Sequence, residues 1–202
     1  MLHDESRAET PGLERTVMLT DAVVAIAMTL LVLPLVELAP EVDAGGFGAF
    51  VGDHRDVFLS FVLSFLVIYV FWLAHGRVFA SIRDPGAGMR VLNMLWLLVI
   101  AFLPFPTAVV GREATTTTVP VYVGTMFALS ALTSAMTQVG ARTGRAPSAT
   151  RWHGLLTWAT TAVFGLCALV GAVNPDLGLL GLLLLIVVRV AEVKTPYARR
   201  VT

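Results

Sequence analysis

Charged residues are scarce in this sequence: Asp, Glu, Lys and Arg make up only 14% of its 202 residues, whereas hydrophobic residues make up 56%. A soluble domain of this size seldom combines so little charge with so much apolar side chain, and several membrane spans explain the composition better. The formal net charge is zero, which excludes the basic surface that a nucleic-acid-binding protein needs. We therefore expect an integral membrane protein that contacts the lipid bilayer and binds no nucleic acid.

The sequence also has only one cysteine and lacks the common catalytic motifs. The single cysteine, Cys167, lies in an apolar run and excludes an internal disulfide framework. The histidines at 3, 54, 75 and 153 have no metal-ligand spacing. Nucleophile-elbow, Walker and zinc-protease motifs are absent, so we expect neither an enzyme, nor a cofactor, nor a bound metal beyond a permeating ion. The sequence also lacks the Thr-Val-Gly-Tyr-Gly filter of ordinary potassium channels and the arginine ladder of a voltage sensor.

Long apolar runs are what the sequence has instead. A helix needs about 20 mostly apolar residues to cross a bilayer core, and segments rich in Gly, Pro and polar residues separate six such runs. The runs lie at roughly 17–38, 57–76, 91–110, 119–138, 153–173 and 177–193. We therefore predict an all-α integral membrane protein with six transmembrane helices per subunit, in a single domain that covers residues 1–202.

The basic residues between these runs predict an orientation, because cytoplasmic loops carry an excess of Lys and Arg. Of the 14 basic residues, only Arg55 and Arg112 fall on the side opposite the termini. The others are Arg7, Arg15, Arg77, Arg83, Arg90, Arg142, Arg145, Arg151, Arg189, Lys194, Arg199 and Arg200. Both termini are therefore expected in the cytoplasm. The strong excess of arginine over lysine is typical of a GC-rich bacterial genome, so the expected location is a bacterial plasma membrane.

The first apolar run has two faces of different character. At about 100° per residue, Ile26, Leu30 and Leu33 fall within about 60° of one another on a helix, and Glu37 lies on the same arc. Asp21 lies about 140° from Ile26 and is expected to face the rest of the protein, because intramembrane charges usually face a bundle interior or water. Periodicity alone favours ordinary helix packing or lipid contact for the apolar stripe.

Three segments resemble a known family. "RTVMLTDAVVAIAMTLLVL" (15–33) is similar to the Arg-x-x-x-Phe-Ser-Asp signature and first helix of the transmembrane protein 175 family, the endosomal and lysosomal potassium channels with bacterial homologues. "FWLAHGRVF" (71–79) resembles the family's Trp-x-x-His helix, and "LNMLWLLVIAFLPFPTAV" (92–109) resembles its Asn-led helix ending in Pro-Phe. Residues 111–202 match the family in hydropathy and span count only.

Some positions depart from the family pattern. Leu19 and Thr20 stand where the signature has Phe and Ser, so a hydroxyl is kept and an aromatic ring is lost. Pro34 stands where members often have an acidic residue, and Glu37 follows about one turn later. The resemblance therefore says less about the outer end of the first span than about its middle.

The resemblance implies a homotetramer in which four copies of the first helix line a central pore. Ile26, Leu30 and Leu33 correspond to the family's constricting positions, and rings of such side chains close a pore by dewetting. It also implies a channel that prefers K⁺ among monovalent cations and that also passes Rb⁺ or Cs⁺. Thr29 and Glu37 are candidate ion contacts, although a threonine in a membrane helix more often bonds its own backbone.

A second set of polar residues is expected near the cytoplasmic ends of the first three spans. The first span runs outward and the second returns, so Asp21 and His75 should lie at a similar depth. The resemblance implies a hydrogen-bonded network that ties the first helix to the next two. Its expected members are Arg15, Thr20, Asp21, Trp72, His75 and Asn93. A structural brace is the favoured interpretation, and a pH sensor at His75 is the alternative.

Two other functions stay open. A secondary transporter would need polar groups near the middle of the membrane and usually broken, repeated helices. A proton-permeable leak channel would use the same kind of pore. Oligomeric state separates the first alternative from a channel, because one lining helix per subunit requires a closed ring of subunits.

Overall fold

The computed structural model describes the backbone of residues 11–42, 46–80, 82, 85–142 and 151–194, and most side chains in these ranges. The described chain is helical throughout, apart from short turns. Its helices are α1 (Pro11–Leu30), α2 (Leu33–Glu37), η1 (Ala39–Glu41), α3 (Phe47–Asp53), α4 (Arg55–Ala80), α5 (Ala87–Phe102), α6 (Pro104–Arg112), α7 (Thr118–Arg142), α8 (Arg151–Gly171) and α9 (Pro175–Lys194). Both chain ends, for which a cytoplasmic position is predicted, lie outside the described residues.

Four helical segments are long and apolar enough to cross a membrane. They are Gly12–Glu41, Arg55–Ala80, Ala87–Arg112 and Thr118–Arg142, and they coincide with the first four predicted runs. Two shorter apolar stretches, Trp158–Gly171 and Pro175–Leu185, lie in α8 and α9, where the fifth and sixth spans are predicted. The all-helical membrane fold is therefore confirmed, whereas the count of six spans stays a prediction.

Proline explains why two of these segments are interrupted, the first between α1 and α2 and the third between α5 and α6. Pro34 lies in the first turn of α2, and Pro104 begins α6. Proline has no backbone N–H and clashes with the preceding turn, so it is tolerated in a first turn and interrupts a helix that would run through it. At the second break, the N–H of Leu103 bonds the carbonyls of both Val99 and Ile100, which tightens the last turn of α5.

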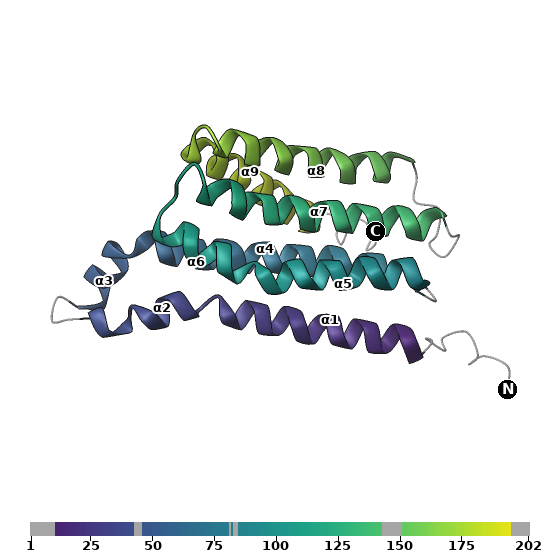
Figure 1. Cartoon of the computed structure of the whole chain (residues 1–202), viewed down its shortest axis with the longest axis horizontal. Helices are drawn as coiled ribbons and strands as arrows, with labels where there is room; N and C mark the ends of the chain where they lie inside the picture. The colour runs from purple at the N-terminus through teal and green to yellow at the C-terminus, as the bar shows by residue number, and fades with distance from the viewer. Residues whose placement is uncertain (1–10, 43–45, 81, 83–84, 143–150, 195–202) are drawn as a thin grey trace, which may run out of the picture.

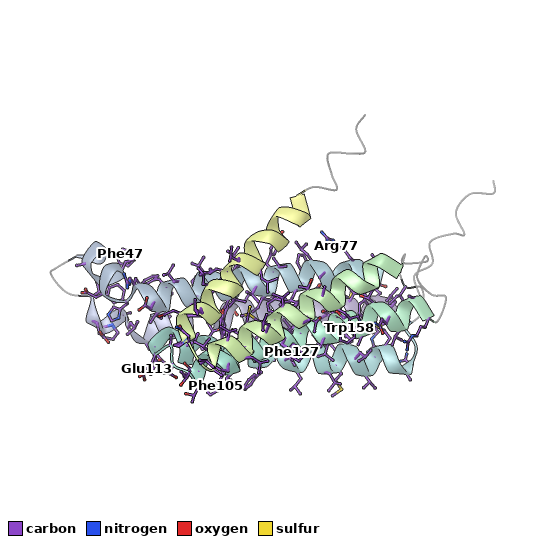
Figure 2. The ribbon with its side chains drawn as sticks, turned by 90° about the horizontal axis from the view of Figure 1, so that it is seen from above. Phe47, Arg77, Phe105, Glu113, Phe127 and Trp158 are labelled. Carbon is purple, nitrogen blue, oxygen red and sulfur yellow. The ribbon has the colours of Figure 1, made fainter. Side chains whose placement is uncertain are left out.

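Helix α7 lies at the centre of the bundle. It packs against α4, α5, α6, α8 and α9, and Tyr122, Val123, Met126 and Leu129 on it are completely buried. Helix α1 lies at one edge of the bundle, where it packs on α4 and α5 (Figure 1). Helix α9 crosses the others obliquely (Figure 2). Side-chain burial agrees with a central α7 and a peripheral α1, since α1 has fewer buried positions than α7.

The two ends of the bundle differ in their charged residues. The start of α1, the α4–α5 connection and the end of α7 lie at one end, and α2, α3 and the α6–α7 connection lie at the other (Figure 1). Arg15 and Arg90 lie near the starts of α1 and α5, and Arg77 and Arg142 lie in the last turns of α4 and α7, so all four belong to the first end. This arrangement has the alternation of span directions that the sequence predicts for the first four spans.

Candidate functional site

The first span presents a face that the rest of the described chain does not cover. Val24, Ala27 and Leu31 point into the bundle and are at most 3% exposed. The predicted stripe points away from it: Ile26 is 59% exposed and Leu33 is 50% exposed. Large apolar side chains on the free face of an edge helix are available for lipid, for another subunit or for a pore.

A break between α1 and α2 divides this stripe. The first helix ends at Leu30, and Leu33 is the first residue of α2, so the three stripe residues lie on two helices. The turn between them is closed by a bond from the Val32 N–H to the Thr29 carbonyl, with an N–O distance of 3.3 Å. The hydroxyl of Thr29 donates to the Ile26 carbonyl over 2.7 Å. This hydroxyl proton is therefore engaged with the helix backbone, and the oxygen stays exposed beside the stripe.

Two contacts between acidic and basic side chains lie at the C-terminal end of the first span, which is its predicted outer end. Arg112 Nη2, at the end of α6, donates to Glu37 Oε2, at the end of α2. His54 Nε2 lies 3.2 Å from Glu41 Oε2. Both carboxylates are exposed. Glu37, predicted as a candidate ion contact, thus has a cationic partner within its own subunit, which the sequence reasoning did not foresee.

A buried hydrogen-bond chain joins α4, α5 and α1. His75 Nε2 lies 2.6 Å from Asn93 Oδ1, and Asn93 Nδ2 lies 3.3 Å from Thr20 Oγ1. The Thr20 hydroxyl donates to the Thr16 carbonyl over 2.9 Å. With His75 protonated on Nε2, each of these bonds has one donor and one acceptor. Thr20, His75 and Asn93 are at most 3% exposed, so this chain links three helices where water is excluded.

Aromatic rings enclose His75 on two sides. Its ring centroid lies 4.4 Å from that of Phe79, in a stacked arrangement, and 4.5 Å from that of Trp96. The indole N–H of Trp96 donates to Thr133 on α7. The histidine is thus held by rings as well as by its hydrogen bond, which favours a fixed structural position.

Asp21 and Arg15 are placed outside this buried chain. Trp72 Nε1 donates to Asp21 Oδ1 over 2.8 Å, and this bond ties α1 to α4 in an exposed position. Asp21 thus contacts α4, as the prediction that it faces the rest of the protein requires, but its side chain is exposed beside Trp72 and is not buried in the bundle. Arg15 is exposed and makes no hydrogen bond or ion pair with the other predicted members within the described part of the chain. The predicted members thus form two separate bonded groups, and Arg15 belongs to neither.

A second buried polar group, which the sequence reasoning missed, joins α4, α6 and α7. Ser64 Oγ lies 2.7 Å from Tyr122 Oη, and the Thr107 hydroxyl donates to Ser64 Oγ over 2.9 Å. All three side chains are buried. Hydroxyl residues inside apolar runs are the signal that could have suggested it, but their partners depend on helix rotation. Across the described residues, no three His, Cys, Asp or Glu side chains are grouped to hold a metal ion.

Known proteins are similar in sequence to the part of the chain that carries the stripe and the buried hydrogen-bond chain. A protein-family model described as endosomal/lysosomal potassium channel TMEM175 matches residues 15–104. "Potassium channel B446_29190" of Streptomyces collinus is 36% identical over 94 residues, which are 46% of this chain and 45% of that protein. "Potassium channel Cha6605_3372" of Chamaesiphon minutus is 32% identical over 113 residues, 55% of this chain and 54% of that protein. The matched region thus spans about half the length of each relative.

A solved structure extends the likeness of the fold to nearly the whole chain. It is the crystal structure of a lysosomal potassium-selective channel TMEM175 homolog from Chamaesiphon minutus, with a TM-score of 0.76 and 20% sequence identity, and the match covers 91% of this chain and 99% of that one. At this identity the likeness concerns the fold alone. The sequence matches over the stripe and the buried hydrogen-bond chain show that residues 15–104 resemble the TMEM175 family.

Proposed function

We propose that this chain is one subunit of a homotetrameric cation channel that prefers K⁺ and lies in a bacterial plasma membrane. The observation that carries the proposal is the free face of the first span, where Ile26 and Leu30 at the end of α1 and Leu33 at the start of α2 are exposed. Four such helices around a common axis would cover this face and line a pore with it. The relatives named as potassium channels and the family match over residues 15–104 support this assignment.

Conduction would depend on the width of the apolar neck. A narrow ring of isoleucine or leucine side chains excludes water, and a bare ion does not leave its hydration shell for a methyl-lined passage. When the ring dilates, K⁺ passes more readily than Na⁺, because K⁺ holds its hydration shell less tightly. Rb⁺ and Cs⁺ should therefore also pass. Thr29, whose oxygen is exposed beside Ile26, is the candidate polar contact within this neck.

The buried hydrogen-bond chain would serve as a brace for the pore helix. Thr20 on α1 is connected through Asn93 on α5 to His75 on α4, and Trp72 holds Asp21. These contacts lie on the opposite side of α1 from the stripe, so they would fix the rotation of the helix. The rotation decides which side chains point to the axis.

Currents from the purified protein test the proposal. The tetramer is reconstituted in planar bilayers with opposing KCl and NaCl gradients, and the reversal potential gives the ion preference. We expect single-channel current steps. We also expect a reversal potential that is displaced from zero toward the equilibrium potential of K⁺. The absence of any cation current from stable, reconstituted tetramers would contradict the proposal. A reversal potential that follows an imposed pH gradient instead would favour the proton-permeable alternative.

The helix breaks favour one further candidate, a secondary transporter. Such proteins bind substrate where membrane helices are interrupted, and this chain has interruptions at Leu31–Val32 and at Leu103. A transporter gives no single-channel steps and works without a ring of four subunits. The same recordings, with the subunit number determined by native mass spectrometry, separate the two functions.

A further inference from the structure

The outer end of the first span is only lightly packed. None of the five residues of α2 is buried, including Leu33, and its main helical neighbours are α4 and η1. The break that precedes α2 separates it from α1. Packing therefore constrains the direction of α2 weakly, and side-chain contacts at its end have more influence on where it lies.

Helix α6 offers a firm anchor beside it. Four of its nine residues are buried, among them Gly111. A Cβ atom on Gly111 would lie 2.3 Å from Ser60 Oγ of α4, so the backbones of α6 and α4 are in close approach. Arg112 follows directly and ends the helix. Its guanidinium therefore projects from a part of the subunit that has little freedom to move.

The contact between Glu37 and Arg112 connects these two parts. It joins the last residue of α2 to the last residue of α6 across 75 positions of sequence. Arg112 is one of only two basic residues on the predicted outer side; the other, Arg55, has its Nε 3.5 Å from the neighbouring Asp56. A carboxylate that bonds the guanidinium is drawn toward its own subunit.

We propose that Arg112 is a positioning residue for conduction: by bonding Glu37 it fixes α2, and with it Leu33, at the wall of the outer half of the pore. This inference rests on the proposed channel function. Arg112 does not touch the permeating ion in this arrangement. It acts through Glu37, which ends the helix that Leu33 begins, so losing either side chain of the pair releases the same segment.

A purely electrostatic role makes a different prediction. If Glu37 and Arg112 acted only through their charge near the mouth, removing the carboxylate would lower K⁺ conductance and removing the guanidinium would raise it. Both effects would vanish at high salt, because salt screens exposed charges beyond about 10 Å at 0.1 M. If the pair positions α2, both removals shift conductance in the same direction, so the sign of the Arg112 effect separates the two roles.

The test compares Glu37→Gln, Arg112→Gln, Arg112→Glu and the exchanged pair Glu37→Arg/Arg112→Glu in reconstituted tetramers. Glu113→Gln is the matched control, because it removes an exposed carboxylate next to Arg112 that forms no ion pair among the described residues. The first readout is single-channel K⁺ conductance at low and high salt. The second is the rate at which a water-soluble thiol reagent modifies Leu33→Cys, in a background with the buried Cys167 replaced by alanine.

We expect each single change at 37 or 112 to shift both readouts by roughly twofold to fivefold, the range for losing one exposed ion pair. The exchanged pair should return both to the wild-type values, and Glu113→Gln should leave both unchanged. Conductance shifts of opposite sign that disappear at high salt would overturn the proposal. So would an exchanged pair that behaves like Arg112→Glu alone. If the wild type carries no K⁺ current, the channel function itself fails, whereas the modification rate of Leu33→Cys still reports whether Arg112 positions α2.

Discussion

The side-chain oxygen of Asn93 accepts a hydrogen bond from His75 Nε2 over 2.6 Å, in a buried contact between α4 and α5. The amide group of the same Asn93 reaches Thr20 on α1. One asparagine therefore connects the first three membrane segments of the subunit. A side-chain amide suits this position because it offers an acceptor and a donor at once.

Removing either side chain of this bond should destabilise the subunit. His75→Ala and Asn93→Ala each leave a buried polar partner unsatisfied, and we expect each to lower the free energy of unfolding by about 1–3 kcal/mol. The double variant should lose less than the sum, because the two changes break the same bond. Thermal unfolding of the detergent-solubilised protein measures this coupling.

Asp21→Ala is the comparison for the His75 and Asn93 substitutions. Asp21 bonds Trp72 and not His75, and it is exposed, so its loss should cost less than the loss of Asn93. Combining Asp21→Ala with His75→Ala should give a nearly additive effect, since no direct bond joins them. A strong coupling between these two residues would mean that they act as one unit in the assembled channel.

Substitution of Ile26 tests the apolar neck. Ile26→Asn should wet the constriction, so we expect higher K⁺ conductance and a lower preference for K⁺ over Na⁺ in bilayer recordings. Leu98→Asn on α5 is the control, because Leu98 is 66% exposed and lies on another helix. Val24 is unsuitable as a control, since it is 3% exposed and a change there tests folding. Unchanged currents in Ile26→Asn tetramers would remove this residue from the constriction.

Gly111 should be intolerant of any side chain. A Cβ there would lie 2.3 Å from Ser60 Oγ and 3.2 Å from Ser60 Cβ. We expect Gly111→Ala to destabilise the protein by about 1–3 kcal/mol, the usual effect of overpacking. Gly124→Ala on α7 is the matched control, since nothing lies within 4 Å of its added Cβ. Equal melting temperatures for the two variants would show that α6 can move away from α4.

The predicted orientation is tested with reporter fusions. A reporter that is active only in the cytoplasm, fused after Thr202, should be active, and the same reporter inserted in the loop at 41–53 should be inactive. The physical reason is the concentration of arginine on one side of the spans. Activity at the loop and none at the C-terminus would reverse the orientation and place Glu37 and Arg112 in the cytoplasm.

The sequence by itself determined the helical membrane class, the positions of the first four spans and the free face of the first helix. These properties are local: apolar runs of sufficient length must cross the bilayer, and a helical period of about 3.6 residues assigns each side chain to a face. Ile26 and Val24 therefore fall on opposite sides of α1, exposed and buried, as their positions on a helix require.

Only the tertiary structure decided which polar atoms meet. His75 bonds Asn93, Asp21 bonds Trp72, and Glu37 bonds an arginine 75 positions away. A hydrogen bond forms only within about 3.2 Å and over a limited range of angles, so it depends on the rotation and crossing of whole helices. Those are set by packing around α7 and by the helix directions that follow the breaks at Pro34 and Pro104. No short segment of sequence specifies that packing or those directions.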